Sequence, residues 1–201
     1  MVRSLGTASV RLACAAVLAA TALSVQVSVA EDLVPKETRF GFEDNSSPGV
    51  PNCTLAAYIS NFPAPEFVNV RFRVDAYPQK NVMFFSIATD VGEQLYKGGM
   101  PSGNRKVAID QAEFSAADFD SLGRMHTTFD DAGVQLSTND AEVFPILALT
   151  FQNGHFTIRF RRQGTDMIRG YAISASPSVV AIPSGQFRDC MTAMLAVVKA
   201  R

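Results

Sequence analysis

The sequence predicts a mostly β protein: a single β-sandwich-like domain with a short helix before the penultimate strands and a helix at the C-terminus. Two observations support this prediction. Short segments of alternating apolar and polar residues recur along the chain, separated by turns rich in glycine, proline and asparagine. The last segment instead repeats its apolar residues at helical spacing. Because no repeat or interdomain linker interrupts this pattern, we expect one domain, over residues 53–201.

Residues 1–30 have the three parts of a secretory signal peptide. Arg3 and Arg11 supply positive charge, residues 12–27 are apolar, and Ser28-Val29-Ala30 places small residues before a polar sequence. The apolar run is shorter than the about 20 residues that a membrane-spanning helix needs. We therefore expect cleavage near Ala30, a periplasmic or secreted protein, and no transmembrane segment in the mature chain.

Removal of the leader changes the cysteine count and the charge. Cys14 is lost with the leader, which leaves Cys53 and Cys190 as an even pair; this favours a disulfide in an exported protein, and the alternative is two unpaired buried thiols. The whole chain has a formal net charge of −1, and losing two arginines makes it more acidic. This balance argues against nucleic acid, or an anionic membrane, as an obligate partner.

The first half of the mature chain predicts an arm followed by strands. Residues 31–52 are polar and contain several prolines, and we expect an extended or flexible N-terminal arm there. Residues 53–62 fit a strand or a short helix. From Phe67 to Asp75, apolar and polar residues alternate strictly, which indicates a half-buried strand. Val82 to Thr89 is apolar on both faces and predicts a fully covered central strand.

The middle of the chain predicts short strands between turns. Gly98 to Asn104 predicts a loop, and residues 105–110 a short strand after it. Residues 114–129 predict two short strands broken around Leu122-Gly123, and a turn at 130–133 leads to a strand over 134–137.

Residues 139–154 fit two structures. In the first, Asn139 caps a helix that ends at Gly154, or a shorter helix starts at Pro145 so that the proline lies in its first turn. In the second, Asn153-Gly154 is the turn of a β-hairpin. Of these two structures, we favour the helix. Strands follow over 155–161 and 167–174, and a final helix opens at Pro183-Ser184.

No catalytic, metal or cofactor signature is present. His126 and His155 are the only histidines, and they form no metal-binding pair with each other. A nucleophile elbow and a phosphate-binding loop are both absent. We therefore assign no catalytic residue, metal or cofactor. The alternative is a periplasmic hydrolase in which His126 or His155 meets one of the acidic pairs, which are Asp118 with Asp120, Asp130 with Asp131, and Asp140 with Glu142.

Four arginines suggest a binding face. Arg71 and Arg73 lie on the polar side of one predicted strand, and Arg159 and Arg161 on the polar side of another. If those strands are neighbours, the guanidinium groups line one sheet face that suits the anionic groups of an envelope glycolipid, or an acidic envelope or host protein. The alternative is that each arginine pairs with a surface carboxylate and keeps the sheet hydrated.

The order of elements from Phe144 to Leu195 resembles the small exported bacterial proteins of the invasion-associated locus B type and their uncharacterised relatives. The run from Pro145 to Gly154, the strand His155 to Phe160 and the stretch Ile182 to Phe187 carry the resemblance. It implies an exported β-sandwich and no known catalytic residue. The sequence as a whole thus predicts an exported, non-enzymatic binding or envelope-associated protein.

Overall fold

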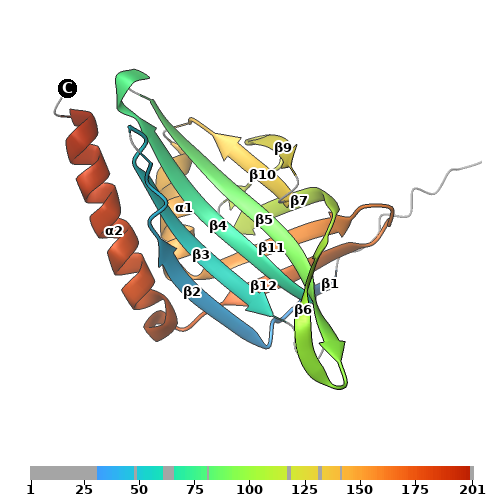
Figure 1. Cartoon of the computed structure of the whole chain (residues 1–201). Coiled ribbons are helices and arrows are strands. Elements are labelled where there is room, and N and C mark those ends of the chain that lie inside the picture. Colours follow the sequence, from blue (N-terminus) through green and yellow to red (C-terminus); the bar gives the residue numbers. More distant parts are fainter. Residues whose placement is uncertain are drawn as a thin grey trace, which may run out of the picture.

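The computed structural model describes residues 31–47, 49–60, 66–80, 82–116, 119–130, 133–140 and 142–199, and the predicted signal peptide lies outside them. Within these residues two sheets face each other (Figure 1). The larger sheet has the spatial order β2 (Glu37–Glu43), β3 (Asn52–Ser60), β4 (Glu66–Tyr77), β5 (Val82–Lys97), β10 (Gly133–Thr138) and β9 (His126–Asp130), and β6 (Met100–Val107) pairs with β5. The smaller sheet has the order β1 (Glu31–Leu33), β12 (Ile168–Ser174), β11 (His155–Arg162), β7 (Ile109–Ala116) and β8 (Phe119–Asp120).

Two helices complete the fold, α1 (Val143–Asn153) and α2 (Pro177–Lys199). The arrangement confirms the predicted mostly β, sandwich-like fold with one helix before the penultimate strands and one at the C-terminus.

Stacked phenylalanines join the two sheets through α1. Phe151 of α1 lies between Phe72 of β4, at a ring-centroid distance of 5.2 Å, and Phe114 of β7, at 5.1 Å. All three side chains are fully buried. Aromatic pairs of this kind add about 0.5–1.5 kcal/mol each beyond the area that they bury. The helix α1 is therefore part of the core between the sheets.

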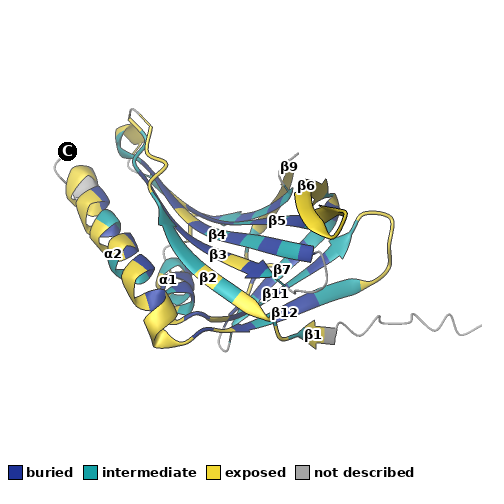
Figure 2. Cartoon of the chain, turned by 60° about the horizontal axis from the view of Figure 1, so that its bottom comes forward, coloured by how far each residue is buried: buried dark blue, intermediate teal, exposed yellow. Residues whose placement is uncertain are grey.

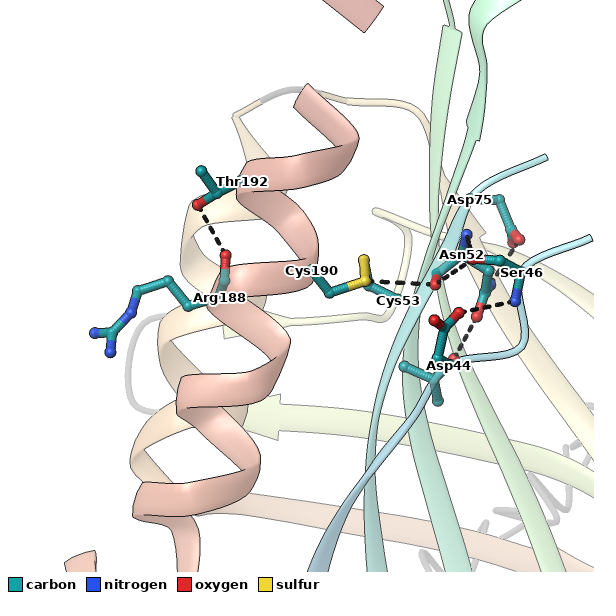
Figure 3. The surroundings of a disulfide bond; sticks show 9 residues. Asp44, Ser46, Asn52, Cys53, Asp75, Arg188, Cys190 and Thr192 are labelled. Carbon is teal, nitrogen blue, oxygen red and sulfur yellow. Dashed lines mark hydrogen bonds between the residues drawn. A yellow bond between two sulfur atoms is a disulfide. The ribbon is translucent and has the colours of Figure 1, made fainter. Parts of the chain in front are cut away.

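The helix α2 is bonded to the larger sheet by the predicted disulfide between Cys53 of β3 and Cys190 (Figure 3). Phe187 of α2 packs on Phe72, with ring centroids 5.6 Å apart. Both helices and the smaller sheet thus cover the same face of the larger sheet. The opposite face of the larger sheet, its outer face, carries no covering layer among the described residues (Figure 2).

The prediction of an N-terminal arm over residues 31–52 is wrong, because this segment contributes a strand to each sheet. β1 pairs in parallel with β12, and β2 pairs with β3 along its whole length. Phe40 and Phe42 of β2 pack against the hydrophobic core. The domain therefore begins before Cys53.

The segment 98–104 also differs from the expected loop. Gly98 and Gly99 have φ of 61° and 81° and form the tip of a tight hairpin between β5 and β6. A two-residue hairpin turn of this kind needs positive φ at both positions, which glycine adopts without strain. Most of the expected loop is therefore strand β6, and β5 extends to Lys97.

The predicted central strand is central but is covered on only one side. Ile87 is fully buried in the core, whereas Phe84 on the outer face is 42% exposed. Phe84 packs edge-on against Tyr77 of β4. The apolar residues on both faces of β5 therefore reflect one core face and one local aromatic contact.

α2 starts earlier than the sequence indicated, and α1 starts between the two predicted positions, after the expected Asn139 cap and before Pro145. α1 ends at Gly154, as the helical alternative predicted, and Pro145 is its third residue, where a missing N–H breaks no intrahelical bond. The predicted Asn139 cap does not form; instead Asp140 Oδ1 accepts from the N–H of Glu142 at 2.9 Å. α2 begins at Pro177 and contains Pro183, because its inward-packing residues already start at Val180.

Candidate functional site

The outer face of the larger sheet holds a group of polar side chains that we call the polar face. Strand register places Tyr58 opposite Asn69 and Asn69 opposite Asp90, and directly paired residues point to the same side of a sheet. The polar face consists of side chains from five strands and the turn after β2: Arg39, Glu43, Asn45, Thr54, Tyr58, Asn69, Arg71, Arg73, Asp90 and Gln135.

Arg71 lies at the centre of the polar face between two carboxylates. Its Nη1 donates to Asp90 Oδ2, and its Nε lies 3.5 Å from Glu43 Oε2. The Tyr58 hydroxyl donates to Glu43 Oε1, and Asn45 Nδ2 donates to Glu43 Oε2 at 3.2 Å. The network connects β2, β3, β4 and β5, so the four strands hold its groups at fixed positions.

These contacts determine which groups are charged at neutral pH. Burial opposes ionisation of Glu43, but the hydrogen bond from Tyr58 and the charge of Arg71 outweigh it and lower the Glu43 pKa. Burial and the bond to Glu43 raise the pKa of Tyr58. Burial opposes the charge on Arg71, but Asp90 outweighs it and raises the Arg71 pKa. The polar face therefore presents carboxylates, a guanidinium and a neutral phenol.

A second set of contacts fixes the ends of β3 and β4 next to the disulfide (Figure 3). Asp75 Oδ1 accepts from Arg73 Nη2 and from Asn52 Nδ2, each at 2.7 Å. Asn52 Oδ1 accepts from Thr54 Oγ1 at 2.9 Å. Asn52 and Thr54 are almost fully buried, so these groups support the sheet and leave little surface for a ligand.

Two neighbouring hollows lie along the polar face. One, of about 380 Å³, is lined by Glu43, Arg71 and Asp90. The other, of about 730 Å³, is lined by Tyr58, Asn69 and Phe67. The bond from Tyr58 to Glu43 links the two hollows. Both are shallow depressions in a sheet surface, which suits a ligand that lies along the strands.

Phe67 provides an aromatic surface in the larger hollow. A Cβ atom placed on Gly92 would lie 2.2 Å from Phe67 Cζ, so the ring lies directly against the glycine backbone. Register pairs Phe67 with Gly92 across β4 and β5. The glycine thus allows the ring to lie close to the sheet, beside the amide of Asn69.

The structure does not form the predicted arginine face. Arg71 and Arg73 are on β4 in the larger sheet, whereas Arg159 and Arg161 are on β11 in the smaller one. Arg159 binds Asp32 through two hydrogen bonds of 2.9 and 2.6 Å, and Arg161 binds Asp110 at 2.8 Å. The alternative interpretation, in which each arginine pairs with a surface carboxylate, is the one observed.

A charged cluster between the two sheets was missed by the sequence analysis. Glu66 of β4 accepts from Arg162 Nη2, from Arg169 Nη1 at 3.1 Å and from the Tyr171 hydroxyl at 2.6 Å. Arg162 also donates to Glu93 Oε1 at 2.7 Å. We call these five residues the Glu66 cluster. It joins β4 and β5 of one sheet to β11 and β12 of the other at one end of the sandwich.

The described residues do not assemble the composite histidine site of the alternative prediction. His155 Nδ1 lies 3.1 Å from Ser174 Oγ, and no described carboxylate bonds to either group. The described residues also contain no group of three or more histidine, cysteine or acidic side chains that could hold a metal ion. Asp118 and Asp131 lie outside the described residues.

Comparisons of this chain with protein-family models, with curated proteins and with solved structures found no match. In the part of the chain that the structure describes, neither helix is long and apolar enough to cross a membrane.

Proposed function

We propose that this chain is an exported, non-enzymatic binding protein that holds a neutral, polyhydroxylated ligand, such as an envelope glycan, on its polar face. The observation that carries the proposal is the network of Tyr58, Glu43, Arg71 and Asp90 between two hollows. The disulfide supports export, since such bonds persist in oxidising compartments.

The balance of charge supports a neutral ligand. The hollows are lined by as many acidic as basic side chains, namely Glu37, Glu43 and Asp90 against Arg39, Arg71 and Arg73. An anionic ligand would be repelled by these carboxylates as well as attracted by the guanidinium groups. Hydroxyl groups both donate and accept, so they can bond to either kind of side chain at its remaining positions.

The aromatic side chains support a ligand with flat apolar faces. Tyr58 is 36% exposed, and Phe67 is partly exposed against Gly92. Sugar rings present C–H groups on one face and hydroxyl groups around the edge, which matches an aromatic ring beside amides and charged groups. Ligand sites typically combine an apolar surface with a few positioned polar groups in this way.

The proposal is tested by screening the full chain, expressed with its leader, against a panel of neutral and anionic bacterial envelope glycans, followed by calorimetric titration. We expect a neutral glycan to bind, and Phe67→Ala and Asp90→Asn each to weaken binding at least about tenfold, equal to about 1.4 kcal/mol. Arg161→Gln is the matched control, because it removes an ion pair on the other sheet.

Three results would overturn the proposal. The first is a panel in which no neutral glycan binds. The second is a bound glycan whose affinity is unchanged by Phe67→Ala and Asp90→Asn, because the ligand would then lie elsewhere. Preferential binding of anionic glycans would also contradict the argument from charge balance.

A further inference from the structure

The hairpin formed by β5 and β6 extends beyond the sandwich (Figure 1). Among the described residues, pairing between β4 and β5 runs as far as Glu66 with Glu93, and β5 continues to Lys97 in pairing with β6. Residues 94–104, which we call the hairpin tip, therefore form a two-stranded projection. The strand β6 is exposed from Met100 to Lys106 (Figure 2).

The hairpin tip carries apolar side chains that contribute little to the core. Met100 is 71% exposed, Tyr96 44% and Leu95 41%. Register places Tyr96 opposite Pro101 and Met100 opposite Lys97, so Tyr96 and Met100 lie on opposite faces of the hairpin close to the Gly98-Gly99 turn. Exposed apolar side chains are common singly, but three of them at the end of one projection indicate a contact surface.

The charge of the hairpin differs from that of the chain as a whole. Residues 94–106 include Lys97, Arg105 and Lys106 and no acidic residue, although the chain has a net charge of −1. Arg105 binds Glu93 at the base of the hairpin, and its side chain remains 65% exposed. Lys97 is thus the one charged residue of the hairpin tip itself, which has a positive charge on a chain of net negative charge, so the argument from overall charge against a membrane does not extend to the tip.

The base of the hairpin is fixed, while the two glycines of its turn have open space around them within the described part of the chain. Gln94 Nε2 donates to the carbonyl of Gly103 at 2.9 Å across the two strands. Glu93 binds Arg105 of β6 and Arg162 of β11, which ties the base to the Glu66 cluster. A Cβ atom at Gly98 or Gly99 would meet nothing within 4 Å. The protein can thus hold the apolar turn away from its body at a fixed orientation.

We propose that the hairpin tip docks the protein on an anionic lipid surface. Leu95 and Met100 would enter the boundary between headgroups and acyl chains, and Tyr96 would lie at the headgroup level, where tyrosine is enriched. Lys97 and the exposed basic side chains of β6 would face the lipid phosphates. The residues that would enter the lipid, Leu95, Tyr96, Lys97 and Met100, do not line the hollows of the polar face, although Gln94 and Asn104 at the start and end of the tip border the larger hollow.

The small size of the tip favours lipid over a protein partner. A stable protein interface buries about 800 Å² on each side, more than three partly exposed side chains at a turn supply. Membrane docking needs no matched partner surface, since apolar burial and attraction to anionic headgroups act together. The contact requires only that the tip projects, as it does here.

The test measures co-sedimentation of the full chain with vesicles of phosphatidylcholine alone, or with one third phosphatidylglycerol. All variants are compared with the same N-terminus, verified by mass spectrometry, so that the leader affects them equally. We expect binding to the anionic vesicles that weakens with added salt. The double variant Tyr96→Ser with Met100→Ser should bind at least about tenfold more weakly, and Lys97→Glu about fivefold or more.

A control variant and a fluorescent probe complete the test. Ile182→Ser removes an apolar side chain that is 73% exposed on α2, and it should leave binding unchanged. The chain has no tryptophan, so Tyr96→Trp introduces a single tryptophan, in the tip, and Phe84→Trp places one at similar exposure on the outer face. Vesicles with brominated lipid should quench the first and leave the second unchanged.

The proposal is overturned if the full chain does not bind anionic vesicles, or if the double variant binds as well as the unaltered protein. Equal quenching of the two tryptophans would also overturn it. Glycan binding that is lost in Phe67→Ala while vesicle binding persists would separate the two functions.

Discussion

Replacement of Glu66 by alanine tests whether the Glu66 cluster holds the two sheets together. Glu66 is 4% exposed, and its carboxylate accepts from two guanidinium groups and from the hydroxyl of Tyr171. The change leaves Arg162 and Arg169 without their shared carboxylate at the edge of the core. It also leaves the Tyr171 hydroxyl without the Glu66 bond.

The expected loss follows from burial and from the remaining contacts. Breaking a buried ion pair costs about 3–5 kcal/mol. Arg162 keeps its bond to Glu93 at 2.7 Å, and the side chains of Arg162 and Arg169 are 24% and 36% exposed, so water offsets part of this cost. We therefore expect Glu66→Ala to lower the free energy of unfolding by about 3 kcal/mol. Tyr171→Phe, which removes the hydrogen bond to Glu66, should lower it by about 1 kcal/mol.

The assay is urea unfolding at neutral pH followed by circular dichroism, with the disulfide intact. The matched control is Arg39→Ala, which removes an exposed ion pair with Glu37 on the outer face and should cost less than about 0.5 kcal/mol. A loss below about 1 kcal/mol for Glu66→Ala would refute the reasoning, because the cluster would then contribute no more than a surface pair. The denaturant slope must be unchanged for the comparison to hold.

Three further predictions concern other parts of the fold. Cys53→Ser with Cys190→Ser opens a loop of 137 residues and should lower the free energy of unfolding by about 2–5 kcal/mol; a change below about 1 kcal/mol on urea unfolding would contradict this. Gly92→Ala pushes the Phe67 ring off the sheet, so glycan affinity should fall with a stability loss of only about 1 kcal/mol, and unchanged affinity in calorimetric titration would argue against the ring's role. Hydrogen bonds from two arginines lower the pKa of Glu93 below its ordinary value of 4.5, so the stability that this carboxylate contributes is complete above that pH and is lost as the pH falls below it. Glu93→Gln should therefore flatten the fall in unfolding free energy between pH 5 and about 3, and an unchanged acid slope would contradict the assignment.

The strands and helices with strong periodicity could be predicted from the sequence. Phe67 to Asp75 and His155 to Arg161 alternate strictly, and both are strands in the structure. Gly154 ends α1 in a left-handed conformation with φ of 67°, which glycine favours over other residues. In these places the local pattern and the tertiary contacts favour the same structure.

The sequence-based prediction was wrong in two segments where residues typical of turns lie beside a strand. β2 alternates around Phe40 and Phe42, but the proline, asparagine and serine residues that follow made the whole of 31–52 look like an arm. The glycines of 98–104 suggested a loop, although only Gly98 and Gly99 form the turn. In both segments the many turn-forming residues made the adjacent strand look like part of a loop.

The prediction of a shared arginine face was wrong for a different reason. Alternation showed correctly that Arg71 and Arg159 lie on the polar sides of their strands, but it carries no information about which strands pair. In the structure the two residues belong to different sheets. The assignment of strands to sheets depends on which distant strands pair, such as β11 with β7, and one sequence does not display these pairings.

The Glu66 cluster shows how a charged residue at an apolar position of an alternating strand can indicate a buried ion pair. Glu66 lies an even number of residues from Val68 and Val70 on its strand, and so does Arg162 from Phe160 and Ile158. Each charged residue therefore points to the inner face, at one end of its strand. A charge at such a position is too costly to bury alone, so it requires an opposite charge from another strand. That rule could have predicted a carboxylate–guanidinium cluster, although not its partners.

The same cluster also connects the core to the hairpin. Glu93 binds Arg162 in the sandwich and Arg105 on β6, at the position where β5 separates from β4. If this contact orients the hairpin tip, Arg105→Gln should weaken vesicle binding by more than the loss of one charge explains. Glu93→Gln removes the same ion pair and keeps the charge of Arg105, so weaker vesicle binding by this variant measures the orienting effect. Binding by Glu93→Gln as strong as that of the unaltered protein would mean that Arg105 acts by its charge alone and that β-pairing is sufficient to hold the tip.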